Sequence, residues 1–176
     1  SVRGITAFTG FYKGKKITVF PSGMGNPSMG IYSYELMNEY NAEVLIRIGT
    51  MGAYTTEIKP FDIVVASSVY SVSNYGLEQT GEKEEIINCN NELLEAVRKH
   101  TNKVDFQVKE GRVHTTDSFY GKVDYENTNA KQSNKKALSL LTVTDHFVTG
   151  EKLTSEERVK NVDAMVYLAL ETIISL

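Results

Sequence analysis

The chain has 176 residues, of which 41% are hydrophobic and 23% charged, and its formal net charge is -3. This composition is typical of one globular domain with a sizeable core, and the small negative charge excludes a global basic field for nucleic acid or an anionic membrane. A single cysteine excludes an internal disulfide, and three histidines leave too few ligands for a zinc cluster. With no signal-like start and no apolar run of membrane-spanning length, we expect a cytoplasmic protein that binds no metal.

The first part of the chain predicts a hairpin, a glycine-rich loop, a helix and a buried strand. β-branched and aromatic residues flank a glycine turn and predict strands over residues 6–11 and 16–20. The loop "PSGMGNPSMG" follows, and then apolar residues at helical spacing run from Met29 to Tyr40. The next strand is predicted over residues 44–49.

The rest of the chain alternates predicted strands with predicted helices. In order, we expect a strand over 61–69, a helix near 90–100, a strand over 106–114 and a strand over 137–146. Apolar residues then repeat at helical spacing from Val159 to Ile173, and Thr154 and Glu157 have the spacing of a capping box. Because the strands are apolar almost throughout, the fold class predicted is α/β, with a sheet covered on both faces.

Three of the predicted strand ends carry unusual chemistry. They read "FPSGMGNPS", "RIGTMGA" and "TVTDH". In α/β sheets, ligands bind where strands end and loops begin, so these three segments point to one site.

The glycine-rich loop imitates the start of a dinucleotide fingerprint. However, Pro27 removes an amide donor, and Ser28 stands where the fingerprint has its third glycine or an alanine. The following strand also ends in Gly49 and Thr50 where an acid would hold a ribose. A nicotinamide site is therefore disfavoured, and a plain tight turn stays open.

Arg47 lies in the middle of an apolar strand and needs a partner. A buried, unpaired guanidinium costs roughly several kcal/mol, so its partner is a carboxylate elsewhere in the fold or an anionic ligand. The Thr50 hydroxyl and the glycine-rich backbone that follows would add donors for a phosphate-sized anion. A structural ion pair remains the alternative.

Asp145 and Arg158 are candidates for a second part of the site. Asp145 ends an apolar strand, where it either caps a turn or serves as a general acid. Arg158 stands in the first turn of a helix, against the macrodipole, and is either a surface residue or, if the preceding loop folds back, a partner of Asp145. Phe119 and Tyr120 fit core positions, with base stacking as a second interpretation.

Four separated segments resemble a known family: "RGITAFTGFYKGKKITVFPSGMGNPSMGIYSYEL", "IRIGTMGA", "DSFY" and "LLTVTDH". In this order they are similar to motifs of the bacterial high-molecular-mass purine nucleoside phosphorylases. Their superfamily also includes uridine phosphorylase and the adenosylhomocysteine nucleosidases. The resemblance implies a three-layer α/β/α fold with a central mixed, barrel-like sheet. It also implies a homo-hexamer built from dimers that complete each other's sites.

The resemblance also implies roles for individual residues. Arg47 and Thr50 match the phosphate binders, and Arg3 matches an arginine that a neighbouring subunit lends to the same phosphate. The residues matching nucleoside contacts are Met24 under the ribose, Phe119 on the base, and Thr144 beside the acid. Asp145 matches the acid that protonates or hydrogen-bonds purine N7, and Arg158 the arginine that moves toward it.

The implied reaction is phosphorolysis of purine ribo- and deoxyribonucleosides in purine salvage, with phosphate as co-substrate and no cofactor. Uridine phosphorylase is an alternative, because "RIGT" is the form that this motif takes in that enzyme. The pyrimidine enzymes, however, lack an acidic residue at the position of Asp145. A nucleosidase would hydrolyse without phosphate, which fits poorly with Arg47, Thr50 and Arg3.

Two family segments are missing from this sequence. One is the N-terminal strand with its Gly-Asp-Pro phosphate loop, and the other is a strand carrying the ribose-binding glutamates, which would lie between Thr128 and Asn129. We therefore expect residues 1–176 to be a single domain, the retained part of a longer protein. The alternative is a remnant that binds nucleoside or phosphate without catalysis.

Overall fold

The structure is a computed structural model that describes residues 4–81, 83–118, 123–124, 136–160 and 162–176. The junction between Thr128 and Asn129 lies outside the described residues.

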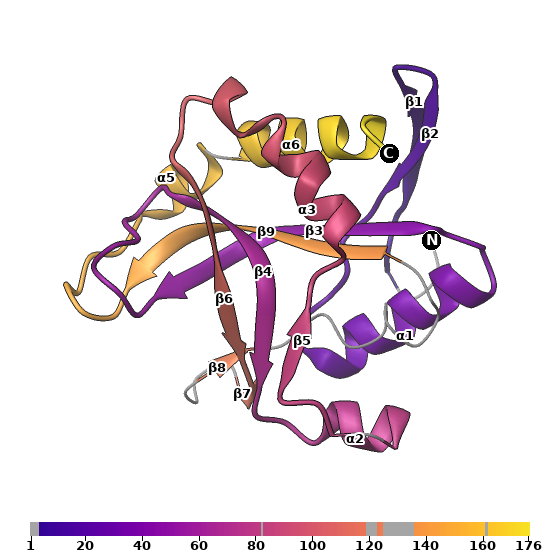
Figure 1. Cartoon of the computed structure of the whole chain (residues 1–176), viewed down its shortest axis with the longest axis horizontal. Coiled ribbons are helices and arrows are strands. Elements are labelled where there is room, and N and C mark those ends of the chain that lie inside the picture. The colour runs from indigo at the N-terminus through magenta and orange to yellow at the C-terminus, as the bar shows by residue number, and fades with distance from the viewer. Residues whose placement is uncertain (1–3, 82, 119–122, 125–135, 161) are drawn as a thin grey trace.

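The predicted alternation of strands and helices is present (Figure 1). The described strands are β1 (Phe8–Tyr12), β2 (Lys15–Val19), β3 (Val44–Ala53), β4 (Ile63–Ser71), β5 (Ile86–Asn88), β6 (Val108–Thr115), β7 (Asp117–Ser118), β8 (Val123–Asp124) and β9 (Lys136–His146). The described helices are α1 (Asn26–Asn38), α2 (Tyr75–Thr80), α3 (Asn91–Arg98), α5 (Ser155–Val159) and α6 (Val162–Ile174), with a short 3-10 turn at Thr101–Lys103.

The central sheet is mixed. β3 and β9 are parallel, and β9 is antiparallel to the first part of β4. One edge of β4 is paired with β6 in parallel, while its other edge is shared between β9 at Ile63 to Val65 and β5 at Ser68 to Tyr70. In Figure 1, α3 and α6 lie on one side of β3 and β9, and α1 lies on the other.

An α/β fold with a mixed central sheet is thus confirmed, but the barrel-like closure implied by the resemblance is not found. Among the described residues the five strands of this sheet form an open path, β3-β9-β4-β5 with β6 against β4. β3 therefore ends the path, with β9 as its one described neighbour.

The main core lies between this sheet and helices α3 and α6. Its strand residues include Ile63, Leu138 and Leu140, and its helix residues include Leu93 and Leu168, all at most 1% exposed. Burying a side chain of this size stabilises the fold by about 1.5–3 kcal/mol. The near-continuous apolar sequences of β4 and β9 are explained by this burial.

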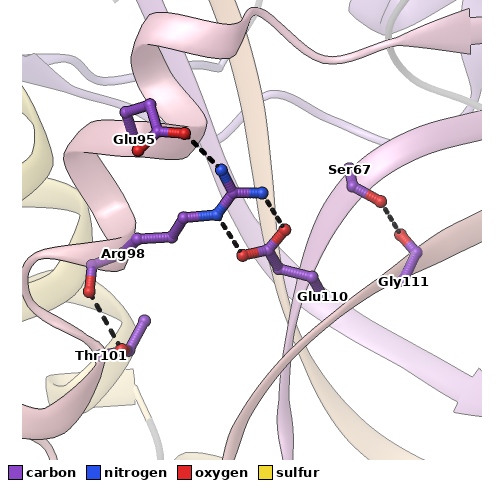
Figure 2. A network of polar contacts seen from close by, with 6 residues as sticks. All are labelled: Ser67, Glu95, Arg98, Thr101, Glu110 and Gly111. Carbon is purple, nitrogen blue, oxygen red and sulfur yellow. Dashed lines mark hydrogen bonds and ion pairs between the residues drawn. The ribbon is translucent and has the colours of Figure 1, made fainter.

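Polar contacts fix α3 to the edge strand β6 (Figure 2). The guanidinium of Arg98 donates two hydrogen bonds to the Glu110 carboxylate, both 2.6 Å long, and a third to Glu95. The hydrogen bonds from Arg98 hold the pKa of Glu110 below its usual value. Because these side chains are 34–67% exposed, solvent weakens the ion pairs, and we expect the network to orient α3 more than to stabilise it.

The β1–β2 hairpin is attached to the end of α6. Tyr12 Oη and Lys13 Nζ both donate to Glu171 Oε1, at 2.8 and 2.6 Å, and Lys15 Nζ donates to the Ile173 carbonyl. Glu171 is 5% exposed, so this carboxylate is buried but has charged and neutral donors. None of the helices in the described part of the chain is long and apolar enough to cross a membrane.

Candidate active site

The site lies where parallel strands β3 and β9 end side by side. Gly52 is in register with Asp145, and Ala53 with His146. Two of the three strand ends singled out in the sequence therefore meet at one edge of the sheet, where α/β proteins bind ligands.

An irregularity in the pairing shapes this edge. The register shifts between Met51 and Gly52, so that Thr144 is an extra residue in β9. Thr144 Oγ1 donates a 2.7 Å hydrogen bond to Asp145 Oδ2. A bulge of this kind re-aims side chains, and here it places a hydroxyl and a carboxyl group on the same side of the strand.

Arg158 reaches the other oxygen of the same carboxylate. Its Nη2 lies 3.4 Å from Asp145 Oδ1, and its Nε donates to the Leu153 carbonyl at 3.1 Å. The loop before α5 folds back onto the end of β9. Leu153 N donates to the Thr144 carbonyl, and the backbone of Lys152 forms an isolated antiparallel β-bridge with that of Asp145. The contact between Arg158 and Asp145, expected from the sequence if this loop folds back, is therefore present. Asp145 is 26% exposed and Arg158 41%, so both remain accessible to a ligand.

His146 fixes the turn that follows. It is 3% exposed, and its Nδ1 accepts hydrogen bonds from the backbone N–H groups of Val148 and Thr149, at 3.3 and 3.1 Å. Accepting both bonds requires an unprotonated Nδ1, which makes His146 a structural residue beside the site.

Arg47 extends along β3 toward the same edge. A Cβ atom added to Gly49 would lie 3.0 Å from Arg47 Nη1 and 3.1 Å from Cζ, so the guanidinium covers the glycine. Arg47 is in register with Ser139 and lies five residues before Gly52, roughly 16 Å along a strand.

Thr50 leaves β3 on the opposite face, because strand side chains alternate. It is exposed and in register with Thr142. Arg47 and Thr50 are thus not brought together on one face of the sheet. An anion bound by both would lie along the outer edge of β3, which the described strands leave unpaired.

Of the other residues implied by the resemblance, Met24 is the one that the structure describes. Met24 lies in the loop before α1 and is 91% exposed, so the described part of the chain leaves it almost uncovered. Arg3 and Phe119 lie outside the described residues.

Two aromatic residues beside Asp145 were not identified from the sequence. The rings of Tyr54 and Phe147 stack with centroids 4.8 Å apart, and the two side chains are 55% and 61% exposed. His114 continues the row, 6.3 Å from Tyr54 and 5.2 Å from Tyr70. A signal was present, because each residue is the first aromatic after the strand ends "TMGA" and "TDH".

Within the described residues, no group of three or more His, Cys, Asp or Glu side chains is placed to hold a metal ion.

Comparison with protein families gives a match to the phosphorylase superfamily over residues 1–135. Among curated proteins, the chain is 42% identical to the DeoD-type purine nucleoside phosphorylase of Mycoplasma genitalium, covering 97% of this chain and 80% of that protein. It is 38% identical to the DeoD-type enzyme of Geobacillus stearothermophilus, covering 98% and 82%.

A solved structure shares the fold at low sequence identity. The protein, from Weissella paramesenteroides, is assigned as a methylthioadenosine nucleosidase. It matches with a TM-score of 0.81 and 16% identity, covering 99% of this chain and 87% of that one. At this identity the likeness concerns the arrangement of the chain alone.

Proposed function

This chain belongs to the phosphorylase superfamily, among its DeoD-type purine nucleoside phosphorylases, and we propose that it cleaves purine nucleosides and deoxynucleosides with phosphate. The products would be the free base and ribose or deoxyribose 1-phosphate. The observation that supports this most is the Asp145 carboxylate, held by Arg158 and Thr144 at the end of β9.

In the proposed reaction, a phosphate oxygen forms a bond to C1′ of the nucleoside as the bond from C1′ to the base breaks. The base leaves with the bonding electrons, and Asp145 in its neutral, protonated form delivers a proton to N7, which makes the base a better leaving group and leaves Asp145 as the carboxylate. General acid catalysis of this kind contributes about a hundredfold to ten-thousandfold. Thr144 and Arg158 each contact one carboxylate oxygen and so orient the group that faces N7.

Phosphate would bind at the outer edge of β3. Arg47 supplies a fixed fork of donors, Thr50 a hydroxyl, and every second residue of the strand directs its backbone N–H toward that edge. We include in the proposal the cytoplasmic homo-hexamer in which Arg3 of a neighbouring subunit completes the phosphate site. Met24 and Phe119 are the proposed contacts to ribose and base.

We also propose that residues 1–176 form one domain that lacks an internal segment between Thr128 and Asn129. The comparison with the Mycoplasma relative runs over 193 positions, whereas 97% of this chain is about 171 residues, so about 22 positions are gaps in this chain. Such gaps favour a second candidate, a protein that binds nucleoside or phosphate without turning it over.

The first experiment measures release of base from inosine, adenosine and uridine, with and without phosphate. The intact mass of the protein used is measured alongside. Phosphate-dependent release from the purine nucleosides is expected. Preference for uridine would identify a uridine phosphorylase, release without phosphate a nucleosidase, and nucleoside binding without release the non-catalytic protein.

Asp145→Asn tests the acid. We expect kcat/KM for inosine to fall by about a hundredfold or more, because an amide is a poor proton donor. In 7-methylinosine the methyl group on N7 already activates the leaving base, so no proton from Asp145 is needed there. Its kcat/KM should therefore change less than about threefold. Asp163→Asn, an exposed acid in the first turn of α6, is the matched control. Equal losses for the two substrates would remove the assignment.

A further inference from the structure

We propose that the Tyr54–Phe147 stack is the surface on which the leaving base packs, and that it selects flat, bicyclic bases beside Asp145. This inference rests on the proposed function.

The first step is that Gly52 gives the Phe147 ring its place. A Cβ atom added to Gly52 would lie 2.2 Å from Cε2 and 2.6 Å from Cζ of Phe147, closer than any real contact. The ring therefore occupies the space that a side chain at position 52 would fill. It is also fixed through its backbone, because Phe147 N donates to the Ala53 carbonyl at 2.9 Å.

The second step is that this ring and the Asp145 carboxyl group share one face of the sheet. Gly52 and Asp145 are register partners, and partners on adjacent strands direct their side chains to the same face, about 4.8 Å apart. The Phe147 ring lies where the Gly52 side chain would be, so it lies next to Asp145. A base whose N7 faces Asp145 would then meet the ring beside it.

The third step is that the stack is supported from behind and uncovered in front. Tyr54 packs on Phe147 with their planes 24° apart, and His114 and Tyr70 continue the row. Burial lowers the pKa of His114, so the ring behind Tyr54 is neutral and adds no charge. Tyr54 and Phe147 nevertheless remain 55% and 61% exposed. Large aromatic rings that are stacked on one another but left in water are typical of a binding surface, and a ligand with its own π-face would cover them.

The fourth step concerns selection. A two-ring base covers more of a stacked aromatic surface than a one-ring base does, so the stack favours purines over pyrimidines. Phosphate has no π-face and lies at the outer edge of β3 in the proposed function. Loss of a ring should therefore affect nucleoside and leave phosphate unchanged.

The test uses Tyr54→Leu and Phe147→Leu in the full chain, with Tyr40→Leu as the matched control. Tyr40 is an aromatic residue 76% exposed just after α1. For either stack variant we expect KM for inosine to rise about tenfold and KM for phosphate to change less than about twofold. An equal rise in both constants, or no rise in the inosine constant, would overturn the inference.

A second measurement does not depend on turnover. The chain contains no tryptophan, so Phe147→Trp introduces a single tryptophan into the stack, whose emission can be excited selectively over that of the tyrosines. Hypoxanthine should quench it in a saturable way, whereas inorganic phosphate should not, and the Tyr40→Trp control should respond to neither. Absence of quenching in a Phe147→Trp variant that carries out phosphorolysis would overturn the inference while the function stands. If the wild-type protein releases no base, the proposed function fails, and saturable quenching would still support base binding at the stack.

Discussion

Two glycines in β3 make room for side chains from elsewhere. Gly49 lies under the Arg47 guanidinium, and Gly52 lies under the Phe147 ring. Neither glycine is in a turn or has a positive φ, so the lack of a side chain is what each position requires. The "RIGTMGA" sequence thus places a cation and an aromatic ring at successive points along one strand.

Gly49→Ala should weaken phosphate binding specifically. The added methyl group would stand 3.0–3.1 Å from the guanidinium, which must shift because the strand backbone cannot. We expect KM for phosphate to rise about fivefold and KM for inosine to stay within about twofold, measured by steady-state kinetics.

Gly111→Ala in β6 is the control, since its methyl group would meet only Val64 Cγ1 at 3.8 Å, an ordinary contact. If Gly49→Ala leaves the phosphate constant unchanged, phosphate binding does not depend on the position of the Arg47 guanidinium over Gly49.

At the scale of elements, the hairpin β1–β2 depends on one carboxylate in α6. Hydrogen bonds from Lys13 and Tyr12 lower the pKa of Glu171, and the same contact raises the pKa of Lys13. A group whose folded pKa is lowered stabilises the protein above its unfolded pKa and loses that effect as the pH falls. A group whose folded pKa is raised loses its effect as the pH rises. The attachment of the hairpin should therefore be strongest between the ordinary values of Glu and Lys, 4.5 and 10.5.

Glu171→Gln should lower Tm by a few degrees at pH 7, and the difference from wild type should shrink as the pH falls below 4.5. Differential scanning calorimetry across pH 3 to 7 measures this. Glu39→Gln, an exposed residue at the end of α1, should show no such pH-dependent difference. A constant difference for Glu171→Gln at every pH would contradict the charge-based explanation.

Hydrophobic periodicity predicted most helices and strands, but neither the full length of paired strands nor the short elements. The strand expected over 44–49 continues to Ala53, because pairing with β9 persists through two glycines that weaken the local signal. Helix α2 and strand β5 were not predicted, since they are short and lie in a polar stretch. The capping box at Thr154 and Glu157 was predicted and is present, because it depends on local spacing alone.

At the scale of the whole molecule, the sequence predicted where strands end but not which strands lie side by side. That "RIGTMGA" and "TVTDH" end together follows from the parallel pairing of β3 with β9, a contact between distant segments that periodicity does not report. The Thr144 irregularity and the Tyr54–Phe147 stack both arise from that pairing, which is why reasoning along the chain missed the stack. The residue roles came largely from the family resemblance, and all of them, including those of Arg47, Asp145 and Arg158, stay predictions.

Cys89 provides a reporter of global opening. Burial raises the pKa of its thiol to about 11, and the side chain is 6% exposed in the main core. A thiol reagent such as iodoacetamide at pH 8 should react about a hundredfold more slowly with the native protein than with the protein in concentrated urea. Rapid, stoichiometric labelling of the native protein would show that this part of the core opens locally.

The pairing of β3 with β9 also has a consequence for biosynthesis. β3 leaves the ribosome well before β9, its one neighbour among the described strands, because more than eighty residues separate them. Until β9 is synthesised, the nascent chain exposes an apolar strand without its partner among the described strands, a state prone to association with other chains. Arg47 in the middle of that strand places a charge where such association would begin. The residue proposed to bind phosphate in the finished protein would thus also protect the unfinished one.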